Sequence, residues 1–123
     1  MTMQCLKSIL LVFLFSIANM AMVEAHAFLD HASPEVGSKV HGSPKEVKVW
    51  FTEKLEAAFS KLQVFNAAGQ ELDSHDQRLD PRSAALLIVG VPPLKPGIYK
   101  VFWRVVSVDT HTTHGSFQFE VVP

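Results

Sequence analysis

The stretch Gly97–Val108 (GIYKVFWRVVSV) repeats large apolar residues at every second position, and this period constrains the fold more than any other feature of the chain. A period of two places these side chains on one face of a β-strand, whereas a helix would scatter them around its axis. The stretch His114–Val122 (HGSFQFEVV) has the same period. The positions predicted to face a core are Tyr99, Val101, Trp103 and Val105 in the first stretch and Phe117, Phe119 and Val121 in the second.

Three shorter runs have β-strand character and are separated by glycine and proline. They are Lys45–Thr52 (KEVKVWFT), Lys61–Phe65 (KLQVF) and Ala84–Val89 (AALLIV). In the first run, Val47, Val49 and Phe51 are predicted to be buried. The second run leads into the turn NAAGQ and is predicted to return through Glu71–Leu72 as a hairpin. Only Leu55–Phe59 has the pattern of a helical turn, so the chain is predicted to be all-β, a sandwich or a barrel.

The N-terminal residues have the pattern of a secretory signal peptide. A charged start precedes the apolar run Ser8–Ala18 (SILLVFLFSIA), and the small residues Val23 and Ala25 follow at the spacing that signal peptidase recognises. The apolar run is shorter than the roughly 20 residues that a membrane span requires. We therefore predict a Sec-type signal peptide over residues 1–25, cleavage after Ala25, and a single domain over residues 26–123. An uncleaved N-terminal anchor is the alternative.

The composition of residues 26–123 limits both the partners and the metal ligands of the domain. The single cysteine, Cys5, and all four methionines belong to the predicted signal peptide, while all six histidines follow it. Any metal site in the domain must therefore use nitrogen and oxygen ligands. The balance of charges is near neutral and gives no indication of a nucleic-acid or membrane-surface partner. We expect a monomer with no stable membrane insertion after cleavage.

Cleavage after Ala25 would give His26 a free α-amine beside its imidazole. The two nitrogens of one residue can then chelate a metal ion, and the ordinary pKa of an α-amine is near 7.7–8, so copper(II) can displace its proton near neutral pH. Copper(II) heads the affinity order of the divalent ions and favours tetragonal nitrogen and oxygen ligands. The simple N-terminal copper motif needs histidine as the third residue, and here that residue is Phe28. The remaining ligands must come from elsewhere in the fold.

Asp109 and His111 are candidates for those ligands. If the chain is extended at this point, residues i and i+2 project to the same side and pair a carboxylate with an imidazole. His114 is expected to lie outside the site as an outer or solvated residue. The other histidines occupy polar or turn-like stretches and are expected to be solvated: His31, His41 and His75.

The sequence resembles the CopC family of small periplasmic copper-binding proteins. The resemblance spans residues 26–123, and its most specific block is PG-x-Y-x-V-x-W-R-V-V-S-x-D-x-H-x-x-x-G-S-x-x-F. It implies a Greek-key β-sandwich or barrel of about seven to eight strands, immunoglobulin-like or cupredoxin-like. It also implies one copper(II) ion per chain, held by His26, Asp109 and His111, with Glu53 as a further outer ligand.

The resemblance further implies a periplasmic role in copper resistance or homeostasis, with an inner-membrane copper importer or another copper-handling protein as partner. Some family members carry a methionine-rich loop for copper(I). The corresponding stretch here, NAAGQELDSHDQRLDP, has no methionine, so a thioether copper(I) site is not predicted.

Two other functions remain as alternatives. Copper oxidases that act on polysaccharides also use an N-terminal histidine chelate on a β-sandwich, but they are usually larger. A metal-free interaction module is the other alternative. No catalytic triad, phosphate-binding loop or zinc-finger spacing is apparent, so the chain is predicted to be a copper carrier and not an enzyme.

Overall fold

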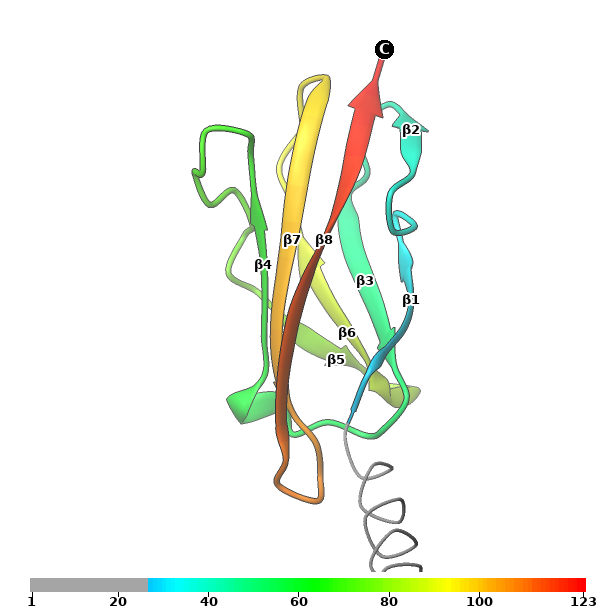
Figure 1. Ribbon diagram of the computed structural model, residues 1–123, viewed down its shortest axis with the longest axis vertical. Helices are drawn as coiled ribbons and strands as arrows, with labels where there is room; N and C mark the ends of the chain where they lie inside the picture. The colour runs from blue at the N-terminus through cyan, green and yellow to red at the C-terminus, as the bar shows by residue number, and fades with distance from the viewer. Residues whose placement is uncertain (1–26) are drawn as a thin grey trace, which may run out of the picture.

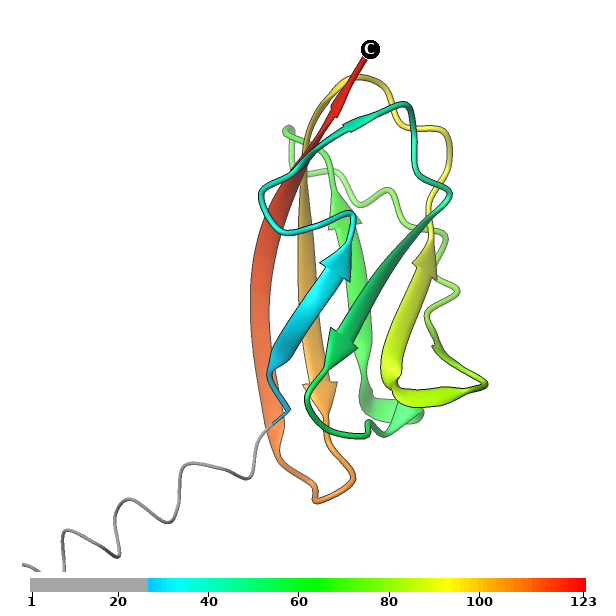
Figure 2. The same cartoon turned by 90° about the vertical axis from the view of Figure 1, so that its right-hand side faces the viewer.

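The structure is a computed structural model, which describes residues 27–123, and these residues form two packed β-sheets (Figures 1 and 2). The first sheet has the order β1-β3-β6-β5 and the second the order β2-β8-β7-β4. The strands of the first sheet are β1 (Leu29–Ser33), β3 (Glu46–Phe51), β6 (Ser83–Gly90) and β5 (Arg78–Asp80). Those of the second are β2 (Lys39–His41), β8 (Thr112–Val122), β7 (Gly97–Val106) and β4 (Lys61–Phe65). A 3₁₀ turn, η1 (Ala57–Phe59), precedes β4.

The chain crosses repeatedly between the two sheets, so strands that are neighbours in sequence often lie in different layers. All pairings are antiparallel except the short one between β2 and the end of β8. The prediction of an all-β Greek-key sandwich of seven to eight strands is confirmed.

The core lies between the sheets, and the alternating positions of β3, β7 and β8 fill it. All ten core positions predicted on these three strands are buried: Val47, Val49, Phe51, Tyr99, Val101, Trp103, Val105, Phe117, Phe119 and Val121. The Phe51 and Trp103 rings meet edge to face with their centroids 5.2 Å apart. Tyr99 stacks on Phe119 at 5.7 Å. The two sheets are held together mainly by the removal of these apolar side chains from water, and the ring pairs add to that stabilisation.

Gly115 is the glycine whose missing side chain leaves room for a core ring. It lies opposite Trp103 in the β7–β8 ladder. A Cβ atom on residue 115 would lie 2.6 Å from Cζ2 of that indole, closer than real carbon contacts permit. The glycine therefore allows the Trp103 ring to lie against β8 and complete the core.

The predicted hairpin after β4 is shorter than expected. The return segment makes only an isolated bridge, between Phe65 and Glu71, in which the Leu72 amide donates to the Val64 carbonyl and the Asn66 amide donates to the Gln70 carbonyl. The partner of β4 along its whole length is β7. The ladder stops because the next residue, Asp73, uses its side chain: the Val64 amide donates to Asp73 Oδ1 at 2.9 Å.

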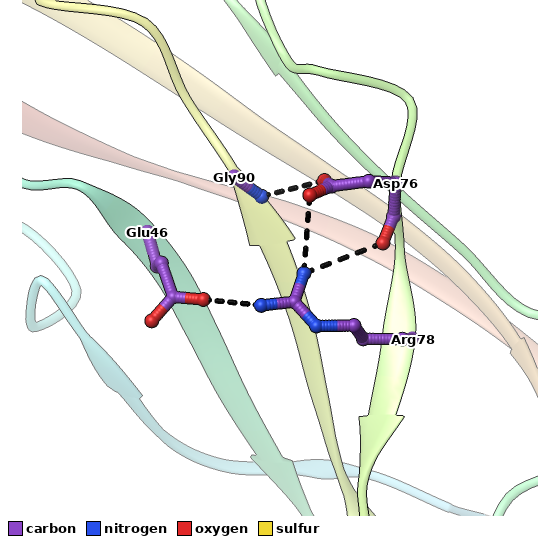
Figure 3. Close-up of polar contacts among 4 residues, drawn as sticks. All are labelled: Glu46, Asp76, Arg78 and Gly90. Atoms are coloured by element: carbon purple, nitrogen blue, oxygen red, sulfur yellow. Dashed lines mark hydrogen bonds and ion pairs between the residues drawn. The ribbon is translucent and has the colours of Figure 1, made fainter.

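An arginine network ties the segment that follows this return to the first sheet (Figure 3). Arg78 Nη2 contacts Glu46 Oε2 at 2.5 Å, and Arg78 Nη1 contacts Asp76 Oδ2 at 3.2 Å. The Gly90 amide donates to the other oxygen of Asp76 at 2.8 Å. These groups are half-exposed, so their main effect is to fix the path of the chain, since exposed ion pairs contribute little stability.

Candidate metal centre

Three segments that are far apart in sequence converge at one end of the sandwich. Thr113, at the start of β8, donates its hydroxyl to the carbonyl of Ala27 at 2.6 Å. The Phe28 amide donates to Thr52 Oγ1 at 2.9 Å, and the Thr52 amide donates to the Phe28 carbonyl at 2.8 Å. Both ribbon views show the start of β1 beside the β7–β8 loop (Figures 1 and 2). The N-terminal end of the described chain is thus fixed against the segment that contains Asp109 and His111.

The loop after β3 completes this end of the molecule. The Val108 amide donates to the Lys54 carbonyl at 3.0 Å, and Leu55 forms an isolated bridge with Ser107. Leu55 is buried beneath the loop and anchors it to the core. The loop that carries Glu53 therefore runs directly beside the β7–β8 loop.

Asp109 and His111 lie in a turn and not in an extended strand, so the geometric reason predicted for their pairing is wrong. Thr110 between them adopts a left-handed backbone with φ of 72°. The Thr110 amide donates to the Ser107 carbonyl at 2.8 Å, and the Ser107 amide donates to the His111 carbonyl at 3.0 Å. The turn nevertheless brings the two side chains together: His111 Nδ1 lies 3.2 Å from Asp109 Oδ2.

The Asp109 carboxylate is held in its ionised form. The Ser107 hydroxyl donates to Asp109 Oδ1, and this bond is the largest cause that lowers the pKa of Asp109 below its ordinary value. Desolvation acts in the opposite direction, and the backbone amide and imidazole of His111 lower the pKa further. Because Ser107 is buried, its hydroxyl is a fixed donor that orients the carboxylate. A carboxylate that is charged and oriented in advance is suited to bind a cation.

Replacing Ser107 with alanine is expected to raise the pKa of Asp109 toward its ordinary value, because the strongest donor to the carboxylate is lost. A pH titration of the Asp109 carboxyl carbon by NMR measures this shift. Ser116→Ala, an exposed position on β8, is the control and should leave the pKa unchanged. An unaltered Asp109 pKa in Ser107→Ala would show that the hydroxyl does not control the carboxylate.

The two outer candidates differ in their relation to this turn. Glu53 is exposed in the loop next to Thr52, on the same end of the sandwich. His114 is exposed on β8, opposite Arg104. Because side chains alternate along a strand and Thr113 faces Ala27, His114 lies on the opposite, outer face of its sheet. The structure therefore places Glu53 near the candidate site, whereas the His114 side chain points to the outer face of the sheet, away from the face on which Thr113 contacts Ala27.

Two of the remaining histidines have exposed side chains with partners outside this turn. His31 stacks on Trp50, with the ring centroids 4.3 Å apart, and contacts Asp30. His41 Nδ1 lies 3.0 Å from the carbonyl of Pro123, at the far end of β8.

His75 is exposed, as its polar surroundings in the sequence predict, but it also contacts two carboxylates. Its Nδ1 atom lies 3.4 Å from Glu71 Oε2 and 3.4 Å from Asp73 Oδ2. The alternate spacing Glu-x-Asp-x-His is visible in the sequence and could have indicated a cluster. Its significance depends on the burial of Asp73, which only the fold reveals.

The predicted signal peptide (residues 1–25) and His26 lie outside the described residues. Signal cleavage, the free amine and the domain boundary at residue 26 therefore stay predictions. Among the residues that the structure describes, no helix is long and apolar enough to cross a membrane.

Comparison with known proteins places these features in a family. A family model described as the CopC domain matches residues 29–122. Protein YobA of Escherichia coli K12 is 34% identical over 100 residues, which cover 80% of this chain and 81% of that protein. Copper resistance protein C of Pseudomonas syringae pv. tomato is 31% identical over 109 residues, covering 82% and 84%. The crystal structure of CopC from Methylosinus trichosporium OB3b superposes with a TM-score of 0.75 at 33% identity, covering 80% of this chain and 95% of that one.

Proposed function

Because this chain belongs to the CopC family, we propose that it is an exported copper(II)-binding protein that buffers or delivers copper. The family consists of copper-binding and copper-transport proteins and not of enzymes. In the proposed site, the amine and imidazole of His26 supply two nitrogens, His111 a third nitrogen and Asp109 an oxygen. One copper(II) ion is bound per chain.

The observation that carries this proposal is the hydrogen bond from Thr113 to the Ala27 carbonyl, 2.6 Å long. His26 directly precedes Ala27 in the sequence, and consecutive Cα atoms are about 3.8 Å apart, so a ligand supplied by His26 would start one residue from this contact. Thr113 is itself two residues from His111. The bond thus supports a chelate in which the new N-terminus and the Asp109–His111 turn act on the same ion.

The proposed ligand set suits copper(II) in both geometry and charge. Three nitrogens and one carboxylate oxygen are the tetragonal donors that this ion prefers, and residues 26–123 contain no sulfur ligand to favour copper(I). Asp109 offsets one of the two positive charges. Its carboxylate is already ionised and oriented by Ser107, so binding does not require a proton to be removed from it.

The site lies at the surface, which favours transfer of the ion over its sequestration. The side chains of Asp109 and His111 are 44% and 50% exposed. A partner protein can therefore approach the ion directly. We propose that this partner is an inner-membrane copper importer or another copper-handling protein, and that export through the Sec-type signal peptide brings the chain to the periplasm.

Copper(II) titration of the chain that begins at His26 tests the proposal. We expect one ion per chain, and Asp109→Ala is expected to weaken binding by more than about 10–100-fold, the range for loss of an outer-shell partner. Competition against a chelator of known affinity measures the change.

The matched control is Asp80→Ala. Asp80 also caps a turn, because the Arg82 amide donates to its Oδ1 at 2.7 Å, but it is the last residue of β5, at the turn to β6. Its loss should leave copper affinity unchanged. Equal affinities for Asp109→Ala and the unaltered chain would refute the proposed ligand set.

A further inference from the structure

Asp73 is a buried carboxylate with one oxygen left without a hydrogen bond. Its side chain is 1% exposed. Oδ1 accepts the Val64 amide at 2.9 Å, whereas Oδ2 has no hydrogen-bond partner among the described residues. Leaving a buried acceptor unsatisfied costs about 1–3 kcal/mol, and more for a charged group. A cation bound at Oδ2 would remove this cost.

The unsatisfied oxygen lies close to two further donor atoms. His75 Nδ1 is 3.4 Å from Asp73 Oδ2 and 3.4 Å from Glu71 Oε2. One donor atom from each of the three residues lies within 4.8 Å of the other two. The other oxygen of Glu71 accepts a hydrogen bond from Gln63 Nε2, which orients the carboxylate toward the cluster.

The two separations between His75 Nδ1 and the carboxylate oxygens fit ligands around a metal better than direct hydrogen bonds. A charge-assisted N–H···O contact is usually about 2.7–2.9 Å, shorter than the separations found here. Zinc(II) binds imidazole nitrogen and carboxylate oxygen at about 2.0–2.2 Å, and two ligands of a tetrahedron with such bonds are about 3.4 Å apart. Ligands at adjacent corners of a square copper(II) plane would be closer together. We propose that Glu71, Asp73 and His75 form a second metal site, which binds zinc(II).

The segment that carries the three ligands is fixed on both sides. The Leu72 amide donates to the Val64 carbonyl at 2.7 Å, and the Ser74 amide donates to the Gly90 carbonyl at 2.9 Å. Beyond His75, Asp76 accepts the Gly90 amide and pairs with Arg78 (Figure 3). The ligands are thus held in place before the ion arrives, while the exposed side of His75 leaves room for a water molecule as a fourth ligand.

This site is separate from the proposed copper site and does not depend on it. Val64, which binds Asp73, pairs with Val101 in the middle of β7. Ser107, in the Asp109–His111 turn, is six residues further along the chain, about 20 Å at the rise of a strand. The two ions would therefore bind independently.

Zinc(II) titration of the full chain that carries Asp109→Ala and His111→Ala tests this proposal without the copper ligands. We expect one zinc(II) ion per chain by calorimetry. A further change of His75→Asn should weaken zinc binding at least about tenfold, since a direct ligand is lost. His75 is exposed and has φ of 56°, a conformation that asparagine adopts readily, so this variant should fold. His41→Asn, on β2 beside the C-terminal end of β8, is the control and should bind zinc(II) as the parent does.

Asp73→Asn provides a second measurement. Asparagine keeps an oxygen for the Val64 amide but removes the negative charge, so zinc(II) should no longer raise the thermal unfolding temperature as it does in the parent. Absence of zinc(II) binding in the parent, or affinity that His75→Asn leaves unchanged, would overturn the proposal. His75 would then be only the ion-pair partner of the two carboxylates. Neither result would bear on copper binding by the unaltered Asp109–His111 turn.

Discussion

A chain that carries one extra methionine before His26 is expected to bind copper(II) at least about 100-fold more weakly than the chain that begins at His26. The extension converts the α-amine into an amide, which is a poor donor, and breaks the chelate formed with the imidazole. The loss should exceed the 10–100-fold that removal of an outer-shell partner costs, because a direct ligand disappears. Competition against a copper(II) chelator at neutral pH measures the two affinities.

One methionine added after Pro123 is the matched control for this extension. Pro123 follows β8 at the opposite end of the sandwich from Ala27 and Thr113, and its carbonyl contacts His41. The same residue added there should leave the affinity unaltered. If the N-terminal extension had no larger effect than the C-terminal one, the amine of His26 would not be a ligand.

The expected result implies that removal of the signal peptide creates the binding site. In the uncleaved chain, the backbone nitrogen of His26 is a peptide amide, so the site loses one donor and the chelate that this nitrogen forms with the imidazole. The three side-chain donors that remain, from His26, Asp109 and His111, would bind copper(II) more weakly. The proposed carrier would thus acquire its high affinity for copper(II) only after export, where the ion is to be handled.

The two-sheet architecture could be predicted from the sequence because it depends on local alternation. Every second residue is buried along most of β7 and along the second half of β8, as the period of two requires. Strand pairing could not be predicted in the same way. The parallel contact of β2 with β8 and the pairing of β4 with β7 depend on chain crossings between the sheets, which leave no local pattern.

The pairing of Asp109 with His111 can be predicted from the sequence, but the structure gives a different reason for it. Sequence spacing alone does not distinguish an extended strand from a turn. The left-handed backbone of Thr110 shows that these two residues lie in a turn. The role of Ser107 could not be predicted because a serine at the end of a strand has no distinctive spacing. Its burial, which makes it a fixed donor to Asp109, is a property of the packed fold.

The cluster of Glu71, Asp73 and His75 also depends on burial that could not be predicted from the sequence. A histidine beside two acidic residues in a polar loop is ordinarily solvated, and the sequence predicts this for His75. What changes the interpretation is the position of Asp73, whose side chain replaces a backbone carbonyl in the bond to Val64 and is buried in consequence. The hydrogen bond from Val64 to the Asp73 side chain forms only because the return segment stops pairing with β4 at this point. This is a tertiary feature that no single residue in the sequence predicts.

Replacing Phe119 with alanine is expected to lower the free energy of unfolding by about 3–5 kcal/mol, the usual cost of removing a buried aromatic side chain. Phe119 is 1% exposed, belongs to the core cluster and stacks on Tyr99. A domain of this size has a free energy of unfolding of about 5–15 kcal/mol, so the variant should still fold but with a much smaller free energy of unfolding. Urea unfolding followed by tryptophan fluorescence measures the loss.

Phe59→Ala is the matched control, because the same ring is removed from a position that is 65% exposed in η1. Its effect should be within about 0.5 kcal/mol of zero. A similar loss in both variants would mean that Phe119 does not pack as described. Because Phe119 lies several residues along β8 from the Asp109–His111 turn, folded Phe119→Ala should still bind one copper(II) ion. Loss of stability with retained binding would separate the core that supports the site from the residues that form it.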